Sequence, residues 1–82
     1  MFVQKKITYE EVKIERSELM SMAEAARELK MSQPGIYRAI EHGRLREIID
    51  KDREGQHFRR LVVRSEVQLM KFDRILRGVM EA

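Results

Sequence analysis

The chain contains no cysteine, one proline and four glycines in 82 residues. Without a thiol it forms no disulfide, no thiolate-bound metal site and no cysteine nucleophile. The glycines stand singly at Gly35, Gly43, Gly55 and Gly78, so the glycine-rich loop that cradles phosphates in nucleotide-binding proteins is missing too. Thiol chemistry and that mode of phosphate binding are therefore excluded.

Long apolar runs are also absent. None approaches the roughly 18 residues that cross a bilayer, and the N-terminus lacks the apolar core of a signal peptide. The missing cysteine fits a reducing compartment. We expect a soluble, cytoplasmic protein with no membrane partner.

The sequence shows no catalytic or metal-binding pattern. His42 and His57 are the only histidines, and neither has a carboxylate or a second histidine at metal-ligand spacing. The serines have no general base at a recognisable spacing. We therefore predict no metal ion, no cofactor and no enzymatic activity.

Positive charge is unevenly distributed along the chain. The net charge is only +3, although 38% of the residues are charged. Residues 44–64 contain seven basic and four acidic side chains, a local excess of three that equals the excess of the whole chain. If the protein binds a polyanion, this segment is the expected contact.

Two short helices with a break between them are predicted in the first half of the chain. The first begins at Ser21, whose hydroxyl forms a capping box with Glu24. The second follows Ser32, a favourable N-cap, tolerates Pro34 in its first turn and stops at Gly43. The expected buried residues are Met22, Ala25, Ala26 and Leu29 in the first helix and Ile36, Ala39 and Ile40 in the second. A helix of about ten residues is not stable alone, so the second must pack on the first.

A basic β-hairpin is predicted next, with strands at 45–50 and 57–63 and a charged tip at 51–55. Both of its faces carry apolar residues. Ile48, Phe58 and Val62 share one parity, and Ile49, Leu61 and Val63 share the other. The helices can cover one face, so another element must cover the second.

The N-terminal arm, residues 1–18, of the same chain or of a partner chain is the candidate to cover the second face, and residues 19–82 form the main domain. Within the arm, the pattern at 6–14 favours a strand with a bulge or turn near Glu10 and Glu11. A frayed, partly helical arm is the alternative.

The C-terminal helix is predicted for residues 65–80, with Ser65 opening a second capping box. Its apolar residues span more than one stripe, and Phe72, Leu76 and Val79 exceed what a small core needs. An apolar surplus at one end of a helix indicates self-association, so we predict an oligomer contact at these three residues.

Four segments together resemble the excisionase-like and MerR-like winged helix-turn-helix domains. They are LMSMAEAA (19–26), MSQPGIYRAI (31–40), GRL (43–45) and RSEV (64–67). The match covers roughly residues 19–72, and its most specific part is S-x-x-x-x-Y-R-x-I followed closely by G-R-L. The resemblance implies an α+β, mostly α-helical fold: a winged helix-turn-helix with a β-hairpin wing, a possible N-terminal strand and a C-terminal helix.

The resemblance also implies a DNA-binding function, as a transcription regulator or an excisionase-type recombination factor. A recognition helix at 33–42 enters the major groove, and a wing at 44–64 lies on the DNA backbone or minor groove. Gln33, Tyr37 and Arg38 match the positions that face DNA in these families. The sequence departs from the family pattern at the turn, where Lys30 replaces a frequent glycine, at the Pro34-Gly35 pair, and in a longer wing. The lysine fits a turn that is not left-handed.

Each matching residue has a chemical role and an alternative. The Gln33 amide suits adenine, the Arg38 guanidinium suits guanine or a phosphate, and the Tyr37 hydroxyl suits a phosphate. Tyr37 is equally compatible with half-buried packing, and Gln33 and Arg38 with a solvated surface. The expected phosphate ligands of the wing are Lys51, Arg53, Arg59 and Arg60. Interleaved acids favour the alternative of ordinary surface ion pairs there.

The expected partner is double-stranded DNA, bound by a homodimer or by a cooperative assembly on adjacent sites, because one module of this size contacts little surface. A recombinase or another protein is a further possible partner. The alternative function is a protein-interaction module, or a phage DNA-packaging subunit, built on the same scaffold.

Overall fold

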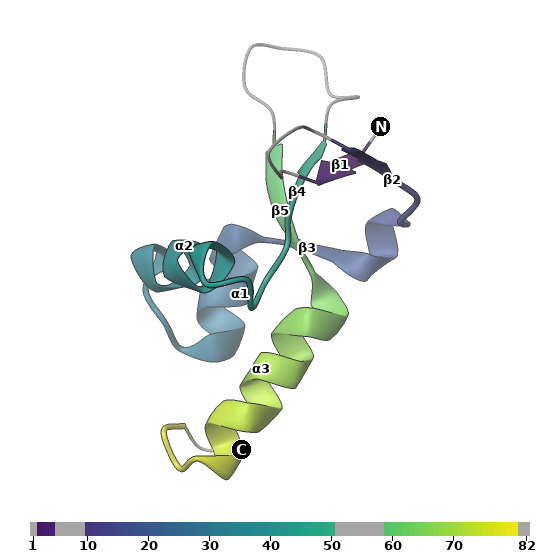
Figure 1. Ribbon diagram of the computed structural model, residues 1–82. Helices are drawn as coiled ribbons and strands as arrows, with labels where there is room; N and C mark the ends of the chain where they lie inside the picture. Colours follow the sequence, from purple (N-terminus) through teal and green to yellow (C-terminus); the bar gives the residue numbers. More distant parts are fainter. Residues whose placement is uncertain (1, 5–9, 51–58, 81–82) are drawn as a thin grey trace.

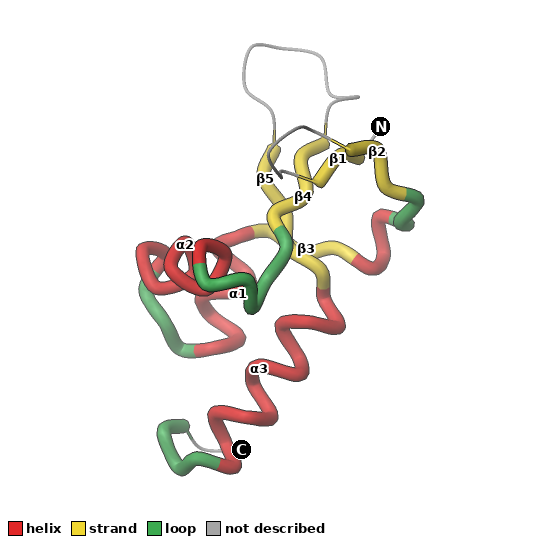
Figure 2. The backbone as a smooth tube through the Cα atoms, viewed as in Figure 1, coloured by secondary structure: helices red, strands yellow, loops and turns green. Residues whose placement is uncertain are grey.

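The computed structural model describes residues 2–4, 10–50 and 59–80. These residues form an α+β fold in which three α-helices accompany one five-stranded antiparallel sheet (Figure 1). The strands are β1 (Phe2–Gln4), β2 (Glu10–Val12), β3 (Leu19–Ser21), β4 (Glu47–Asp50) and β5 (Arg59–Val63), in the order β2-β1-β4-β5-β3. The helices are a 3-10 helix η1 (Arg16–Glu18), α1 (Met22–Leu29), α2 (Gln33–Glu41) and α3 (Arg64–Leu76). α1 and α2 lie together beside the sheet, and α3 leads away from the end of β5 (Figure 2). The α+β class is confirmed, but the sheet is larger than expected.

The N-terminal arm differs from its prediction. Glu10 and Glu11, expected at a turn, lie in β2, and the unexpected strand β1 pairs with both β2 and β4. β3 was not predicted either. Residues 5–9 lie outside the described part of the chain. Strands of three residues are too short to show alternation in a sequence, and their pairing depends on backbone groups that every residue has.

A charged contact fastens the segment before β3 to the sheet. Arg16 Nη2 lies 2.9 Å from Oδ2 of the buried Asp50, and its guanidinium lies 5.4 Å from the centre of the Phe2 ring. Phe2, Val12 and Ile14 pack against the outer face of the sheet. The arm therefore adds apolar side chains to the second face, and its strands β1 and β2 do so as part of the same sheet.

Each face of the sheet carries one hydrophobic cluster. The helix-side cluster consists of Met20, Met22, Ala25, Ala26, Leu29, Ile36, Ala39, Leu45, Val62 and Val67, and the opposite cluster of Leu19, Ile48, Leu61 and Val63. The register places Ile48 opposite Leu61 and Glu47 opposite Val62, so Ile48 and Val62 point to different faces. Grouping them by parity was wrong, because the register between two strands is not readable from numbering within each strand.

The ends of α1 and α2 follow the predicted signals. Ser21 Oγ accepts a hydrogen bond from the Glu24 backbone N–H at 3.1 Å, and Ser32 Oγ accepts one from the Gly35 N–H at 3.3 Å. α2 ends before Gly43, which has a φ of 75°. Lys30 is left-handed, with φ 51° and ψ 46°, so the condition under which a lysine fits this turn is not met. The tight reversal between α1 and α2 imposes this conformation, which disfavours a residue with a Cβ atom.

α3 also differs from its prediction. It runs from Arg64 to Leu76 and does not reach residue 80, so Val79 lies beyond the helix. Its N-cap is Val63, which makes no side-chain cap, and Ser65 lies inside the first turn. The reason is that β5 continues directly into the helix. Glu66 instead accepts hydrogen bonds from the Arg46 backbone N–H at 3.0 Å and from Arg46 Nε at 2.7 Å.

Candidate nucleic-acid interface

α2 has one buried side and one exposed side. It buries Ile36 and Ala39 and packs on α1. Gln33, Tyr37 and Arg38, the three residues predicted to face DNA, are all exposed. They do not point the same way, however. At about 100° per residue, Gln33 and Arg38 lie about 140° apart around the helix axis, so the exposed face has two flanks.

The first flank joins α2 to the sheet. The Arg60 guanidinium lies 6.0 Å from the centre of the Tyr37 ring, within cation–π range. Arg60 Nε also lies 3.3 Å from Glu47 Oε1. Both expectations for Tyr37 are thus compatible with its position: the ring contacts Arg60, while the hydroxyl has no partner among the described residues.

The buried Glu47 fixes the position of Arg60 in the first flank. Its side chain is only 7% exposed, whereas that of Arg60 is 52% exposed. Glu47 Oε1 is buried and accepts no hydrogen bond in the described structure. Its contact with Arg60 is therefore an ion pair without a hydrogen bond. A buried carboxylate needs a nearby cation to offset its lost hydration. Arg60 is therefore held at the junction of β5 and α2.

The second flank borders a hollow of about 550 Å³ between α2 and α3. It is lined by Met31, Gly35, Arg38, Ala39, His42, Arg44 and Met70. We call it the α2–α3 hollow. Arg38 and Arg44 are exposed, and neither has an ion-pair or hydrogen-bond partner for its side chain in the described part of the chain.

The side chains of three predicted phosphate ligands of the wing lie outside the described part of the structure. Lys51 and Arg53 lie outside the described residues, and Arg59 is described only as part of β5. Only the Arg60 side chain is located, and it pairs with the buried Glu47, which differs from the ordinary surface ion pairs of the alternative.

Several cations elsewhere have structural partners. Arg64 Nε and Nη2 donate to the backbone carbonyl oxygens of Ser17 and Leu19, each at 3.2 Å. Lys71 lies 3.3 Å from Glu28.

Arg44 and His42 were not predicted from the sequence to be neighbours of Arg38. The i, i+4 spacing of Arg38 and His42 and the chain reversal at Gly43 were the available signals.

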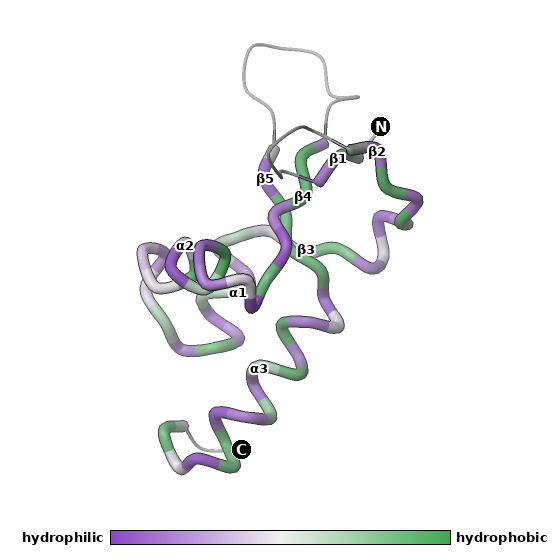
Figure 3. Tube along the Cα trace, in the orientation of Figure 1, coloured by the Kyte–Doolittle hydropathy of each residue, from purple (hydrophilic) through white to green (hydrophobic). Residues whose placement is uncertain are grey.

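The exposed apolar residues of the C-terminal region lie on α3 and just beyond it, and Leu69 shares a recess with Arg44. Leu69, Phe72, Leu76 and Val79 are between 59% and 71% exposed. Leu69, Phe72 and Leu76 share one side of α3, because they lie at i, i+3 and i+7 spacing. Along the chain of α3, hydrophobic and hydrophilic residues alternate (Figure 3). Leu69 joins the three predicted contact residues.

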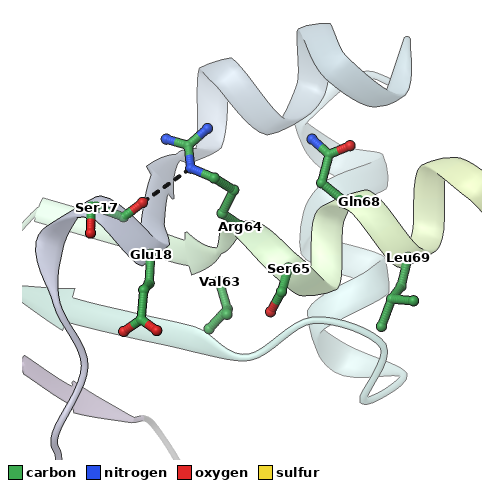
Figure 4. A pocket seen from close by; sticks show the side chains of 7 residues that line it. All are labelled: Ser17, Glu18, Val63, Arg64, Ser65, Gln68 and Leu69. Atoms are coloured by element: carbon green, nitrogen blue, oxygen red, sulfur yellow. Dashed lines mark hydrogen bonds between the residues drawn. The ribbon is translucent and has the colours of Figure 1, made fainter.

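A second hollow, of about 690 Å³, lies between η1 and the start of α3. Figure 4 shows Ser17 and Glu18 at one end, Leu69 at the other and Arg64 between them. The Arg64 guanidinium is already bound to backbone carbonyl oxygens there. This leaves a largely apolar recess.

No group of three His, Asp or Glu side chains in the described residues could hold a metal ion. Of the helices in residues 2–4, 10–50 and 59–80, none has the length and apolarity that a bilayer crossing requires. The chain was compared with protein-family models, curated proteins and solved structures, and none of them matches. Function must therefore be inferred from the geometry and charge of the chain itself.

Proposed function

We propose that the protein binds double-stranded DNA as a winged helix-turn-helix. α1, the turn at Lys30 and α2 form the helix-turn-helix, α2 enters the major groove, and the β4–β5 pair is the wing on the backbone. The observation that carries this proposal is the one-sided packing of α2. It rests on α1 through Ile36 and Ala39 and leaves Gln33, Tyr37 and Arg38 exposed.

The size of α2 supports this assignment. The major groove is about 12 Å wide and admits an α-helix of about 10–12 Å diameter, and the nine residues of α2 provide about 13.5 Å of helix. The helix begins at Gln33, so the amide of this residue enters the groove with the N-terminus and pairs with adenine. The Tyr37 hydroxyl donates to a phosphate beside the first flank.

The biological role that suits such a module is transcription regulation or excisionase-type recombination. A single nine-residue helix reads few base pairs, so useful affinity comes from a homodimer or from cooperative binding at adjacent sites. In the recombination role, a recombinase is the protein partner. The β4–β5 wing supplies contacts that are independent of sequence.

The first test measures binding of the intact chain to random duplex DNA at 50 and 200 mM salt. We expect a Kd between about 10⁻⁶ and 10⁻⁴ M that weakens steeply with salt. No binding in this range, or binding that salt leaves unchanged, would contradict the proposal.

The second test assigns the groove. After selection of preferred oligonucleotides from a random pool, Gln33→Ala is expected to cost about 1–3 kcal/mol at one A·T pair and to leave the other positions unchanged. Gln68→Ala is the matched control, because this exposed glutamine lies on α3 and bonds Glu28. Equal loss in both variants would remove Gln33 from the reading face.

A second candidate function is a protein-interaction module, favoured by the exposed apolar side of α3 at Leu69, Phe72 and Leu76. An apolar surface of this kind is typical of protein contacts and gains nothing from a phosphate backbone. Salt-insensitive self-association without DNA binding would favour this candidate over the first.

A further inference from the structure

We propose that the α2–α3 hollow is a joint site for one backbone phosphate of duplex DNA, held by Arg38 and Arg44 together. Arg38 is then a phosphate ligand and does not read a base. This inference rests on the proposed function and extends it, because it assigns different tasks to the two flanks of α2.

The first support is that no acidic residue lines the hollow beside Arg38 and Arg44. Arg38, His42 and Arg44 line the hollow, and none of the residues that line it is acidic. Arg44 also borders a neighbouring recess with Glu66 and Asp73, but those carboxylates are engaged by Arg46 and Arg77. The guanidiniums of Arg38 and Arg44 therefore remain available for an external anion.

The second support is the way the chain brings these residues together. α2 ends at Glu41, and Gly43 reverses the backbone with a φ of 75°. The Arg44 backbone N–H then donates to the Ala39 carbonyl oxygen at 2.9 Å. This bond returns the chain to the last turn of α2, so Arg44 lines the same hollow as Arg38, six residues earlier.

The third support is the chemistry of the walls. Met31, Ala39 and Met70 are apolar and offer no strong hydrogen-bonding group to a base edge. Long cationic side chains above an apolar floor fit a phosphate, which guanidiniums bind in bidentate fashion. Gln33 lies about 140° away around α2, so it can face the bases while Arg38 faces the backbone at the groove edge.

The test uses the intact chain and the variants Arg38→Gln, Arg44→Gln and the double variant. Binding to a random duplex is measured as log Kd against log salt. Each single variant is expected to weaken binding several-fold with little change of slope, because the other arginine still neutralises the phosphate. The double variant should flatten the slope by about 0.9, the value for one phosphate.

Arg27→Gln is the matched control, since Arg27 is exposed on α1, unpartnered among the described residues and outside the hollow. It should leave both affinity and slope unchanged. Circular dichroism of each variant checks that it is folded.

Three results would overturn the shared site. Slope losses of about 0.9 in each single variant, adding to about 1.8, would mean two separate phosphates. A change of base preference in Arg38→Gln would make this residue a base reader. Sub-millimolar binding of inorganic phosphate with unchanged duplex binding in the double variant would make the hollow a small-anion site. Failure of the proposed function is distinct, because then the unmodified chain itself shows no salt-dependent binding.

Discussion

α2 and α3 both expose one side, but the two sides differ in chemistry. α2 has nine residues and presents Gln33, Tyr37 and Arg38, whereas the longer α3 presents Leu69, Phe72 and Leu76. A polar and cationic face suits a hydrated polyanion, and an apolar face suits another protein surface. Under the proposed function, α2 is the element that contacts DNA, and α3 is the element that contacts another protein.

The largest expected effect concerns how α2 is attached. Ile36 is fully buried against α1. Ile36→Ala should lower the free energy of unfolding by about 2–5 kcal/mol in urea denaturation, because it leaves a cavity under α2. If that variant does not fold, Ile36→Val should cost about 0.5–1.5 kcal/mol. A cost below this range would show that α2 does not depend on this contact.

The next effect separates the two flanks of α2. Arg60→Ala should destabilise the fold by about 1–3 kcal/mol, because it leaves the buried Glu47 carboxylate without a cation. Adding Glu47→Gln should recover much of this loss. Arg38→Ala is the comparison and should stay within about 0.5 kcal/mol, since Arg38 is exposed and unpartnered among the described residues. Equal losses for Arg60 and Arg38 would erase the distinction between the flanks.

The apolar side of α3 provides the third prediction. Phe72→Ser with Leu76→Ser should weaken self-association at least tenfold in sedimentation equilibrium, about 1.4 kcal/mol, because both side chains are exposed in the single chain. Non-specific DNA affinity per chain should not change. Arg27→Ser is the control, because Arg27 is exposed on α1 and unpartnered among the described residues. If the double variant loses DNA binding at a single site, α3 and α2 do not act separately.

Lys30 in the turn between the helices offers a smaller, stabilising change. Its left-handed backbone is strained for a lysine, so Lys30→Gly should raise the free energy of unfolding by about 0.5–1 kcal/mol. Thermal denaturation measures the gain. Lys13→Gly, outside the helices, is the control and should not stabilise. A destabilised Lys30→Gly variant would mean that the lysine side chain has a role of its own.

The smallest effect is a pH dependence at the contact between α1 and α3. Hydrogen bonds from Gln68 and then Lys71 hold the pKa of Glu28 below its usual value. A lowered pKa in the folded state contributes stability above the unfolded pKa and loses it as pH falls through the folded pKa. Glu28→Gln should therefore have a lower melting temperature than the unmodified chain at pH 7, and the gap should shrink on acidification. A gap that widens at low pH contradicts this sign.

The sequence predicted the ends of the helices better than it predicted the strands of the sheet. Ser21, Ser32 and Gly43 act on neighbouring backbone groups within a few residues, so the starts of α1 and α2 and the end of α2 follow from local sequence. Ser65 shows the same capping pattern, but it is not the N-cap of α3. The reason is that β5 runs directly into α3 and Glu66 is bound by Arg46. β1 and β3 gave no signal, since their pairing is made by strands far away in the chain.

For the candidate site, the exposure of Gln33, Tyr37 and Arg38 was predictable from helical spacing. The angle between Gln33 and Arg38 follows from the same spacing, but the neighbours of each flank do not, because they depend on where β5 and α3 pass beside α2. The role of Arg60 shows the same limit, as its partner Glu47 lies on another strand.

The amino-acid order alone determined the short helices, the break between them and the cationic excess in residues 44–64, because caps, apolar spacing and charge counts are local properties. The tertiary structure alone decided which cations stay free. Arg46 and Glu66 are separated by twenty residues, yet they meet, while Arg38 and Arg44 gather at one hollow with no acid among the residues that line it. Charge pairing depends on distance in space, and only the assembled sheet and helices set that distance.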